Sequence, residues 1–228
     1  ELPGKEERIV YSAASGRQQK LYTASALKLK EALAGGAWSG NGKLEVLSQL
    51  MRLRQICCDP ALCFEDYTGE SAKLETCVSL IASASAAGHK ILLFSQFASM
   101  LERIRERLLQ EGISSHLLVG ATPKEERSRM VQAFASDEVP VFLISLKAGG
   151  TGLNLTAADI VIHYDPWWNV AAQNQATDRA YRIGQEKPVT VYKLILKDTI
   201  EENLLKLQNA KLALAAQVVS EGMVSLGD

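Results

Sequence analysis

From residue 71 onward, helical and extended hydrophobic patterns alternate along the chain. One set of apolar residues recurs at helical spacing: Phe97, Met100, Leu101, Ile104 and Leu108. Continuous apolar runs predict strands instead, at residues 90–94, 116–119, 141–145, 159–163 and 189–196. Runs without polar alternation are typical of strands that are buried on both faces. The pattern therefore predicts an α/β fold of three layers, with a parallel sheet between two layers of helices.

Glycine and proline mark the ends of the predicted helices in this region. Gly88 and Gly112 stand where glycine commonly ends a helix. Thr122-Pro123-Lys124-Glu125 has the pattern of a capping box, which starts a helix. Five helices are predicted in this region. The first three cover 71–87, the segment from Phe97 to Gly112, and a segment that starts at Thr122. The fourth runs from about Val170 to Arg182, and the fifth is an amphipathic segment that begins near Thr199.

Residues 1–65 have a different pattern. A short extended stretch, Arg8 to Tyr11, precedes a predicted helix from Gly16 to about Leu33. Four glycines then interrupt the chain, and a second helix runs from about Lys43 to Cys57, ahead of Pro60. We therefore divide the chain into three parts, which are 1–65, 66–198 and 199–228.

Composition limits the class of function. The chain has 228 residues and a formal net charge of −1, so any contact with nucleic acid has to come from a local basic surface. No apolar run approaches the ~20 residues of a membrane span, and we expect no membrane partner. The four cysteines and three histidines do not have zinc-site spacing. We expect buried, reduced thiols and no metal site in this chain.

Arg179 and Arg182 carry the strongest functional signal. On the predicted helix, ~100° per residue places Gln175, Arg179 and Arg182 on one face. One glutamine and two guanidinium groups on a shared face suit a phosphate whose charge is changing. Cations near the end of a helix also interact favourably with its dipole, which explains one arginine but not the shared face.

The segment Lys147 to Leu155 reads KAGGTGLNL, a glycine-rich loop between two predicted strands. Its glycines allow a ligand to approach the backbone, although a tight crossover that needs positive φ has the same composition. The loop is not a Walker A loop, because no Gly-Lys-Ser/Thr sequence occurs in the chain. Leu155 also takes the third glycine position of a dinucleotide fingerprint. With the two arginines, the loop indicates half of a nucleotide-hydrolysis site.

Ligands of parallel α/β sheets bind beyond the carboxyl ends of the strands. Small or basic hydrogen-bond donors follow the predicted strands there: Ser95, Gln96, Gly120, Thr122, Lys147, Thr151 and Asn154. Such groups suit phosphate contacts that hold a nucleic-acid strand without reading its bases.

Two tryptophans and two basic clusters have competing interpretations. For Trp167 and Trp168, we expect one to pack in the core, while the other contacts a sugar–phosphate groove or a partner. The clusters Arg103/Arg105/Arg107 and Lys124/Arg127/Arg129 are more typical of solvated helix faces.

In this order, the motifs resemble the C-terminal RecA-like lobe of a switch/sucrose-nonfermenting-type ATPase, within helicase superfamily two, and the composition looks bacterial. The resemblance covers nearly the whole chain and rests on these segments: Leu53 to Leu62 (LRQICCDPAL), Lys90 to Phe97 (motif IV), Leu118 to Thr122, Ser145 to Asn154 (motif V), Asp165 to Asn169, and Gln175 to Gln185 (motif VI). Asp59, Tyr181 and Val170 replace the usual His, His and Pro of the family.

The resemblance implies roles for individual residues. Arg179 and Arg182 would be arginine fingers for ATP. The Walker motifs and the Mg²⁺ ligands of that ATP would lie on an upstream N-terminal RecA-like lobe. The nucleotide side would be lined by Gly150, Gly152 and Gln175. The DNA backbone would face Ser95, Gly120, Lys147, Thr151, Asn154 and Trp168.

At the level of the fold, the resemblance implies a RecA-like (P-loop NTPase-type) sheet over 66–198. Residues 1–65 would be the segment by which the chain enters the lobe, with a helical protrusion, and 199–228 a brace helix. The implied function is the second motor lobe of a double-stranded-DNA translocase or remodelling ATPase, inactive alone. Its partners would be the upstream lobe, double-stranded DNA and a DNA-bound protein target, in the cytoplasm on the nucleoid, or in the nucleus of a eukaryote.

Two other classes of function stay open. One is a non-catalytic RecA-like module that binds nucleic acid or protein. The other is a free-standing small-nucleotide enzyme, which would need its own phosphate loop after the first strand. Ser95-Gln96-Phe97 is not such a loop.

Overall fold

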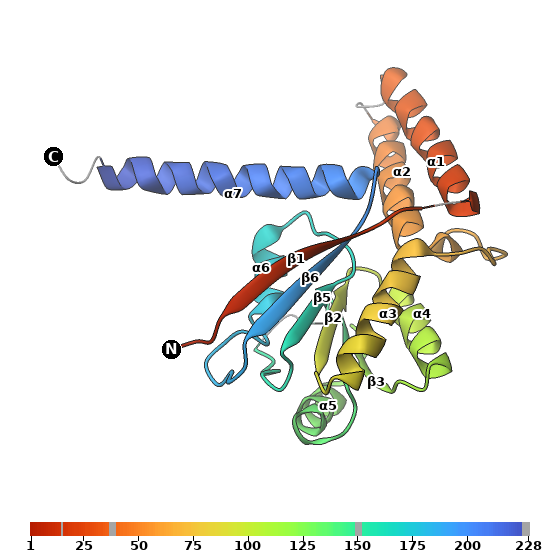
Figure 1. The fold of residues 1–228 in the computed structure, drawn as a ribbon. Coiled ribbons are helices and arrows are strands. Elements are labelled where there is room, and N and C mark those ends of the chain that lie inside the picture. The colour runs from red at the N-terminus through yellow and green to blue at the C-terminus, as the bar shows by residue number, and fades with distance from the viewer. Residues whose placement is uncertain (15, 37–39, 149–151, 225–228) are drawn as a thin grey trace.

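The computed structural model describes residues 1–14, 16–36, 40–148 and 152–224. Its strands form one parallel sheet in the order β1-β6-β5-β2-β4-β3 (Figure 1). The strands are β1 (Lys5–Ser12), β2 (Ile91–Ser95), β3 (Ser115–Leu118), β4 (Val141–Ser145), β5 (Ile160–His163) and β6 (Val189–Leu196). The helices are α1 (Gly16–Ala34), α2 (Asn41–Cys58), the short 3-10 helix η1 (Pro60–Leu62), α3 (Ala72–Ala86), α4 (Ala98–Gln110), α5 (Lys124–Ser136), α6 (Val170–Thr177) and α7 (Ile200–Val224).

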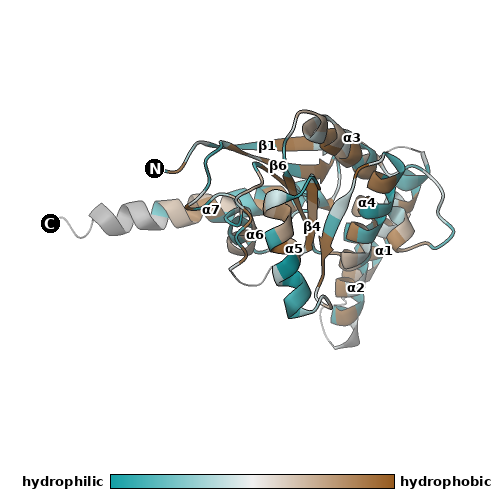
Figure 2. Ribbon diagram, turned by 90° about the horizontal axis from the view of Figure 1, so that it is seen from below, coloured by the Kyte–Doolittle hydropathy of each residue, from teal (hydrophilic) through white to brown (hydrophobic). Residues whose placement is uncertain are grey.

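Helices cover both faces of the sheet. In β2, Ile91 and Leu93 pack with α3 and α4, whereas Leu92 and Phe94 pack with α5 and α6. The hydrophobic strands accordingly lie between two layers of helices (Figure 2). Burial on both faces explains why these strands are continuous apolar runs. The predicted three-layer α/β fold is confirmed.

The first strand is longer than the extended stretch predicted at Arg8 to Tyr11. β1 pairs with β6 along its whole length, from Lys5 opposite Val189 to Ser12 opposite Leu196. It lies at the edge of the sheet, and most of its side chains are exposed. The start of the 1–65 segment therefore contributes a strand to the sheet of the lobe.

Helices α1 and α2 form a hairpin that projects from the body of the lobe (Figure 1). Gln18 of α1 fixes its base, because its side-chain Nε2 donates to the carbonyl of Ile56 (3.1 Å) and its Oε1 accepts from the Ala72 N–H (3.1 Å). One buried amide thus connects α1, α2 and α3.

The terminal helix α7 leaves the lobe after its first turns (Figure 1). Leu204, Leu205 and Gln208 are buried, whereas residues 211–217 are exposed. Gln208 also donates to the carbonyl of Trp167. Only the beginning of α7 therefore packs against this lobe, and the rest extends beyond it.

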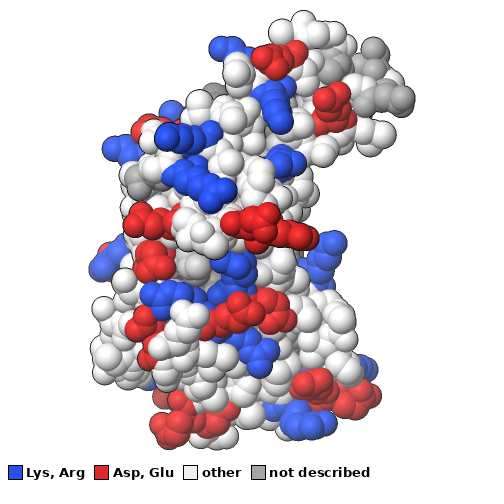
Figure 3. All heavy atoms as spheres, turned by 90° about the vertical axis from the view of Figure 1, so that its right-hand side faces the viewer, with Lys and Arg blue, Asp and Glu red and all other residues white. Residues whose placement is uncertain are grey.

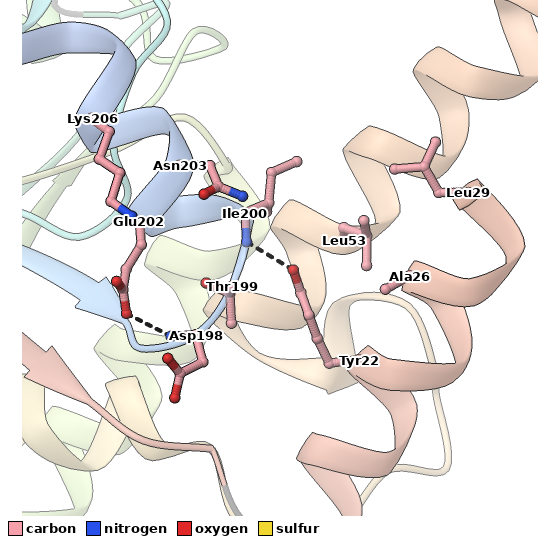
Figure 4. A pocket seen from close by; sticks show the side chains of 10 residues that line it. All are labelled: Tyr22, Ala26, Leu29, Leu53, Asp198, Thr199, Ile200, Glu202, Asn203 and Lys206. Carbon is pink, nitrogen blue, oxygen red and sulfur yellow. Dashed lines mark hydrogen bonds between the residues drawn. The ribbon is translucent and has the colours of Figure 1, made fainter. Parts of the chain in front are cut away.

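The hydroxyl of Tyr22 in α1 accepts a hydrogen bond from the Ile200 N–H (2.8 Å), at the first residue of α7 (Figure 4). Burial raises the pKa of Tyr22 to about 12, so the hydroxyl stays protonated. This bond lies beside a pocket of about 440 Å³ between the helical hairpin and α7. It joins the hairpin to the start of the terminal helix, and it supplies a partner for a backbone N–H that a helix start leaves open.

Candidate functional site

A buried carboxylate connects the carboxyl end of strand β2 to the segment that follows strand β5. Asp165 accepts a hydrogen bond from the Ser95 hydroxyl (2.5 Å) and another from the Gln96 N–H (3.2 Å). Burial raises the pKa of Asp165, and the hydrogen bond from Ser95 opposes this shift. Since Ser95 is fully buried, its side chain has no surface for direct contact with DNA. It holds the loop after β2 against the loop after β5 instead.

The two tryptophans after Asp165 differ in burial. Trp167 lies in the core, and Trp168 is nearly half exposed, as expected for one residue of the pair. Arg54 of α2 has its guanidinium carbon 5.9 Å from the centre of the Trp168 ring and 5.6 Å from that of Phe97. It also donates to the Pro166 carbonyl (3.5 Å). Arg54 was not singled out from the sequence, because its contacts with Pro166 and Trp168 cross more than a hundred residues.

A hollow of about 500 Å³ opens between the loop after β3 and the loop after β4. Lys124 and Lys147 line it, and Lys147 is exposed. Gly120 is exposed, and apart from its chain neighbours no residue that the structure describes places an atom within 4 Å of where a Cβ would stand. Two ammonium groups beside an open backbone suit an anionic ligand such as a phosphate. The rest of the lining is Thr122, Arg127, Ser128, Ala148 and Leu153.

Arg127 holds both loops of this hollow in place. Its guanidinium donates to the backbone carbonyls of Thr122 (2.8 Å), Gly120 (2.9 Å) and Ala148 (3.1 Å). The planar, five-donor geometry of arginine allows one side chain to bind several carbonyls. The prediction of a solvated helix face is therefore wrong for Arg127. Thr122 also departs from the predicted capping box, since its hydroxyl accepts from the Val119 N–H (3.1 Å) and does not cap α5.

The helix predicted to reach Arg182 is shorter in the structure. α6 ends at Thr177, so Arg179 and Arg182 follow the helix, and the single helical face proposed for them with Gln175 is wrong. After Thr177 the N–H groups of Arg179 and Ala180 donate three residues back, to Ala176 (3.2 Å) and Thr177 (3.1 Å), and two further hydrogen bonds hold this segment. The Arg179 carbonyl accepts from the Leu155 N–H (3.0 Å), and the Ala180 carbonyl accepts from the Gln185 side chain (2.9 Å). These carbonyls are thus bound by groups outside the helix.

The turn after α6 still places Gln175 and Arg179 together. Both line a pocket of about 220 Å³ whose other walls are Phe94, Leu146, Trp167, Ala172 and Ala176. Burial and the nearby charge of Arg182 lower the pKa of Arg179. Arg182 itself is exposed. Two neighbouring cations favour an anion between or beside them, because its charge removes their mutual repulsion.

The glycine-rich loop is described only in part. Gly152 and Asn154 are exposed, and Gly152 has a φ of 66°, which favours glycine over any other residue. Gly150 and Thr151 lie outside the described residues. The other candidates form two groups at the carboxyl edge of the sheet, one around Lys147 and one around Gln175 and Arg179.

Two of the residues that depart from the family pattern have partners in the structure. Asp59 accepts hydrogen bonds from the Arg103 side chain (2.7 Å) and from the Ala61 N–H (2.9 Å). Tyr181 donates its hydroxyl to the Pro3 carbonyl (2.8 Å), which ties the motif VI segment to the start of the chain. Both replacements are therefore accommodated by local hydrogen bonds.

Charges of both signs are interspersed on the face that carries α3 and α4 (Figure 3). Arg107 illustrates this, because it pairs with Glu111 (2.5 Å) and with Glu75 (3.2 Å). A surface of alternating charge gives no extended positive field for nucleic acid. The basic hollow around Lys147 is the better candidate for such a contact.

The four cysteines are free thiols, and Cys57, Cys58 and Cys77 are buried. Burial raises the pKa of Cys77 to about 12, which keeps the thiol protonated and unreactive. Within the described residues, no cluster of three or more metal-binding side chains is found. None of the described helices combines the length and hydrophobicity that crossing a bilayer requires.

Comparison with known proteins relates these features to a family. Residues 72–184 match the family model of the helicase conserved C-terminal domain. The chain is 44% identical, over 185 residues, to the putative ATP-dependent helicase/translocase YwqA of Bacillus subtilis. That alignment covers 78% of this chain and 20% of YwqA, so the chain spans about a fifth of that relative.

Solved structures match nearly the whole chain. The SWI2/SNF2 ATPase C-terminal domain of Sulfolobus solfataricus superposes with a TM-score of 0.77 at 32% identity, covering 94% of this chain and 89% of that one. The SWI2/SNF2 ATPase core of the same organism, in complex with dsDNA, gives a TM-score of 0.81 at 35% identity, covering 96% of this chain and 47% of that one. The chain therefore belongs to the SWI2/SNF2 ATPase family, in which it corresponds to the C-terminal RecA-like lobe.

Proposed function

We propose that this lobe supplies Arg179 and Arg182 to an ATP molecule bound on an upstream RecA-like lobe of the same protein. The observation that carries this proposal is the pocket lined by Gln175 and Arg179, with the charge of Arg182 close by. It lies at the carboxyl edge of a parallel sheet, where ligands of such folds bind. An arginine finger contributes ~10³–10⁵ in rate by stabilising charge on the transferring phosphoryl group.

The residues present fit one side of a triphosphate site. Gln175 and the two guanidinium groups offer donors to phosphate oxygens, and the lowered pKa of Arg179 reflects burial and the repulsion of Arg182 that an anion would relieve. We propose that Gly150 and Gly152 approach the nucleotide through their backbone. The phosphate-binding loop and the ligands of Mg²⁺ belong to the upstream lobe in this proposal. Bound Mg²⁺ would neutralise charge on the phosphates.

We propose that double-stranded DNA contacts the second group of residues at this edge. Lys147 presents a donor in the basic hollow, and Gly120, Asn154 and Trp168 are exposed as well. For Thr151, the proposed contact with DNA rests on the family resemblance alone. Ser95 is proposed as a positioning residue, because it holds the loop after β2 against the loop after β5. The SWI2/SNF2 core of Sulfolobus solfataricus, 35% identical, is a complex with dsDNA. Contacts of this kind grip the backbone and ignore sequence.

In this proposal, closure of the two lobes on ATP is coupled to movement along the DNA. Arg179 and Arg182 reach the phosphate only when the lobes approach each other. Alternating closure and opening would move the grip on the backbone along the duplex, independently of sequence. In this proposal, residues 66–198 form the motor lobe together with β1, the remainder of 1–65 forms the helical protrusion, and 199–228 brace the lobe. A DNA-bound protein target and a location on bacterial or nuclear DNA are further parts of the proposal.

The test of this function compares the isolated chain with the full-length protein. The isolated chain is expected to fold, because its core is complete, and to show no ATP hydrolysis with or without double-stranded DNA. The full-length protein is expected to hydrolyse ATP in a DNA-stimulated manner. A phosphate-release assay checks both. Appreciable turnover by the isolated chain would contradict the half-site model.

Replacement of Lys147 by alanine is expected to weaken DNA binding by the full-length protein to a similar degree for every sequence. One lost phosphate contact reduces the slope of log affinity against log salt concentration by about one unit. Binding titrations on several duplexes at several salt concentrations measure both effects. Lys187→Ala, at the opposite edge of the sheet, is the control and should leave affinity and slope unchanged. A loss restricted to some sequences would argue against a backbone contact.

A further inference from the structure

Helix α2 carries a row of large apolar side chains that face solvent. Leu44 is 70% exposed, Leu47 53% and Met51 46%. Positions i, i+3 and i+7 share one side of a helix, so the three residues form one stripe, which we call the α2 stripe. A contiguous apolar surface of this kind on a projecting element is typical of an interaction site.

Helical spacing shows which way the α2 stripe faces. Leu47 stands seven residues, or nearly two turns, before Arg54, and Met51 stands seven before Cys58. At the base of α2, Arg54 contacts the Trp168 ring and the Pro166 carbonyl. The Cys58 side chain packs in the same hydrophobic cluster as Tyr164. These contacts belong to the segment that follows β5, at the carboxyl edge of the sheet.

The α2 stripe therefore rises from the same edge of the sheet as Gln175, Arg179 and Lys147. Helix α2 extends away from the body of the lobe (Figure 1). At its C-terminal end, one side of α2 packs on the segment that follows β5. Further along the helix, the same side carries the α2 stripe and faces solvent. A protein that approaches this edge meets the stripe together with the proposed nucleotide site.

The chemistry of the stripe favours a protein as its occupant. Leucine and methionine side chains offer no donors to phosphates, so the stripe does not suit DNA. The match to the Sulfolobus solfataricus SWI2/SNF2 core covers 96% of this chain but 47% of that one, so about half of that ATPase core lies outside the matched region. In the proposed function, an upstream lobe of about this size lies against the carboxyl edge of the sheet.

We propose that the α2 stripe docks against an apolar patch on the upstream lobe of the same protein when the two lobes close. The proposal rests on the proposed function, because it takes the upstream lobe as the partner across the nucleotide site. Burial of the stripe adds apolar contact to the closed state only. The helical protrusion thereby stabilises the arrangement in which Arg179 and Arg182 reach the phosphate, and Arg54 links the docked helix to Trp168.

The test uses the full-length protein with one fluorophore on each lobe. The double variant Leu47→Glu/Met51→Glu places charges in the docked surface, whereas Leu27→Glu/Leu33→Glu on α1 is the matched control, with exposed fractions of 55% and 37%. Energy transfer is measured with double-stranded DNA and a non-hydrolysable ATP analogue. The α2 variant is expected to lower the ratio of closed to open molecules about fivefold or more, with a parallel loss of DNA-stimulated ATPase. The control should behave as the wild type.

Each other outcome decides against the proposal. Wild-type closure of the α2 variant overturns docking, and so does an equal loss in the α1 control, which would indicate a general effect of charge. A change in oligomeric state with unchanged closure would assign the stripe to a second copy of the protein. Met51→Gln is a milder variant that should give a smaller loss in the same direction. The proposed function is judged separately, because Arg182→Ala abolishes turnover whether or not the stripe docks.

Discussion

Replacement of Arg182 by alanine is expected to lower the DNA-stimulated ATPase rate of the full-length protein by about 10³- to 10⁵-fold. The variant removes a guanidinium that is exposed in this lobe and that, in our proposal, meets the transferring phosphoryl group only in the closed state. Because the phosphate-binding loop lies on the upstream lobe in our proposal, ATP affinity should change little. Steady-state turnover and equilibrium binding of a fluorescent ATP analogue measure the two quantities separately.

Two companion variants sharpen the interpretation of this result. Arg105→Ala removes an exposed arginine from α4, away from the strand ends, and should leave turnover unchanged. Arg182→Lys keeps the positive charge but loses the planar fork, so its rate should lie between those of the wild type and the alanine variant. Near-wild-type turnover of Arg182→Ala would remove Arg182 from the catalytic site. If ATP affinity fell by the same factor as the rate, Arg182 would stabilise bound ATP and not the transition state.

The sequence predicted the central strands well because burial on both faces leaves a strong signal. The run Lys90 to Phe94 and the run Val141 to Ser145 contain no polar alternation, and both become strands in the middle of the sheet. β1 left a weaker signal. Its residues Lys5 to Ser12 are mostly polar and exposed, as edge strands often are, so most of its length was not predicted. The pairing with β6 depends on residues at the far end of the chain.

The end of α6 shows a second limit of local pattern. Helical periodicity continues through Arg182, and the helix nevertheless ends at Thr177. The Arg179 carbonyl accepts from the N–H of Leu155, which lies outside the segment, and a pattern within one segment carries no information on such a partner. Gln175 and Arg179 nevertheless line one pocket, although they do not share a helical face.

Residues that position the site were the hardest to find. Arg127 looks like an ordinary helix-surface arginine in the sequence, and its role appears only when the loops after β3 and β4 lie on either side of it. The prediction for Ser95 differed from the structure in the opposite direction. It was predicted to face DNA because it ends a strand at the functional edge, but its hydroxyl is taken by Asp165, seventy residues away. Residue type and strand position predicted the edge, and tertiary contacts determine which side chains there reach a ligand.

A buried ion pair joins the terminal helix α7 to helix α3. Lys73 of α3 and Glu201 of α7 are almost completely inaccessible, and the Lys73 Nζ lies 2.5 and 2.6 Å from the two carboxylate oxygens. Lys73 also donates to the Tyr164 carbonyl (3.0 Å), and Glu201 accepts from the Leu196 N–H (2.8 Å). Burial disfavours the charged lysine, but the Glu201 carboxylate raises the pKa of Lys73 above its usual value. Burial also raises the pKa of Glu201, and the Lys73 ammonium opposes this shift. The two short contacts between Nζ and the carboxylate oxygens are those of an ion pair in which each charge is stabilised by its partner.

Removal of one partner of this pair is expected to destabilise the fold strongly. Lys73→Met leaves the Glu201 carboxylate buried without its cation, and the free energy of unfolding should fall by about 3–5 kcal/mol. The double variant Lys73→Met/Glu201→Leu removes both charges and should recover most of that loss, because apolar replacements of a buried pair are often neutral. Urea denaturation of the isolated chain measures both values, with Arg107→Ala as a surface ion-pair control that should change stability little. If Lys73→Met were as stable as the wild type, the pair would not be charged in the folded state, and α7 would be held to the lobe by its other contacts, which include the buried Leu204 and Leu205 and the hydrogen bond from Gln208 to Trp167.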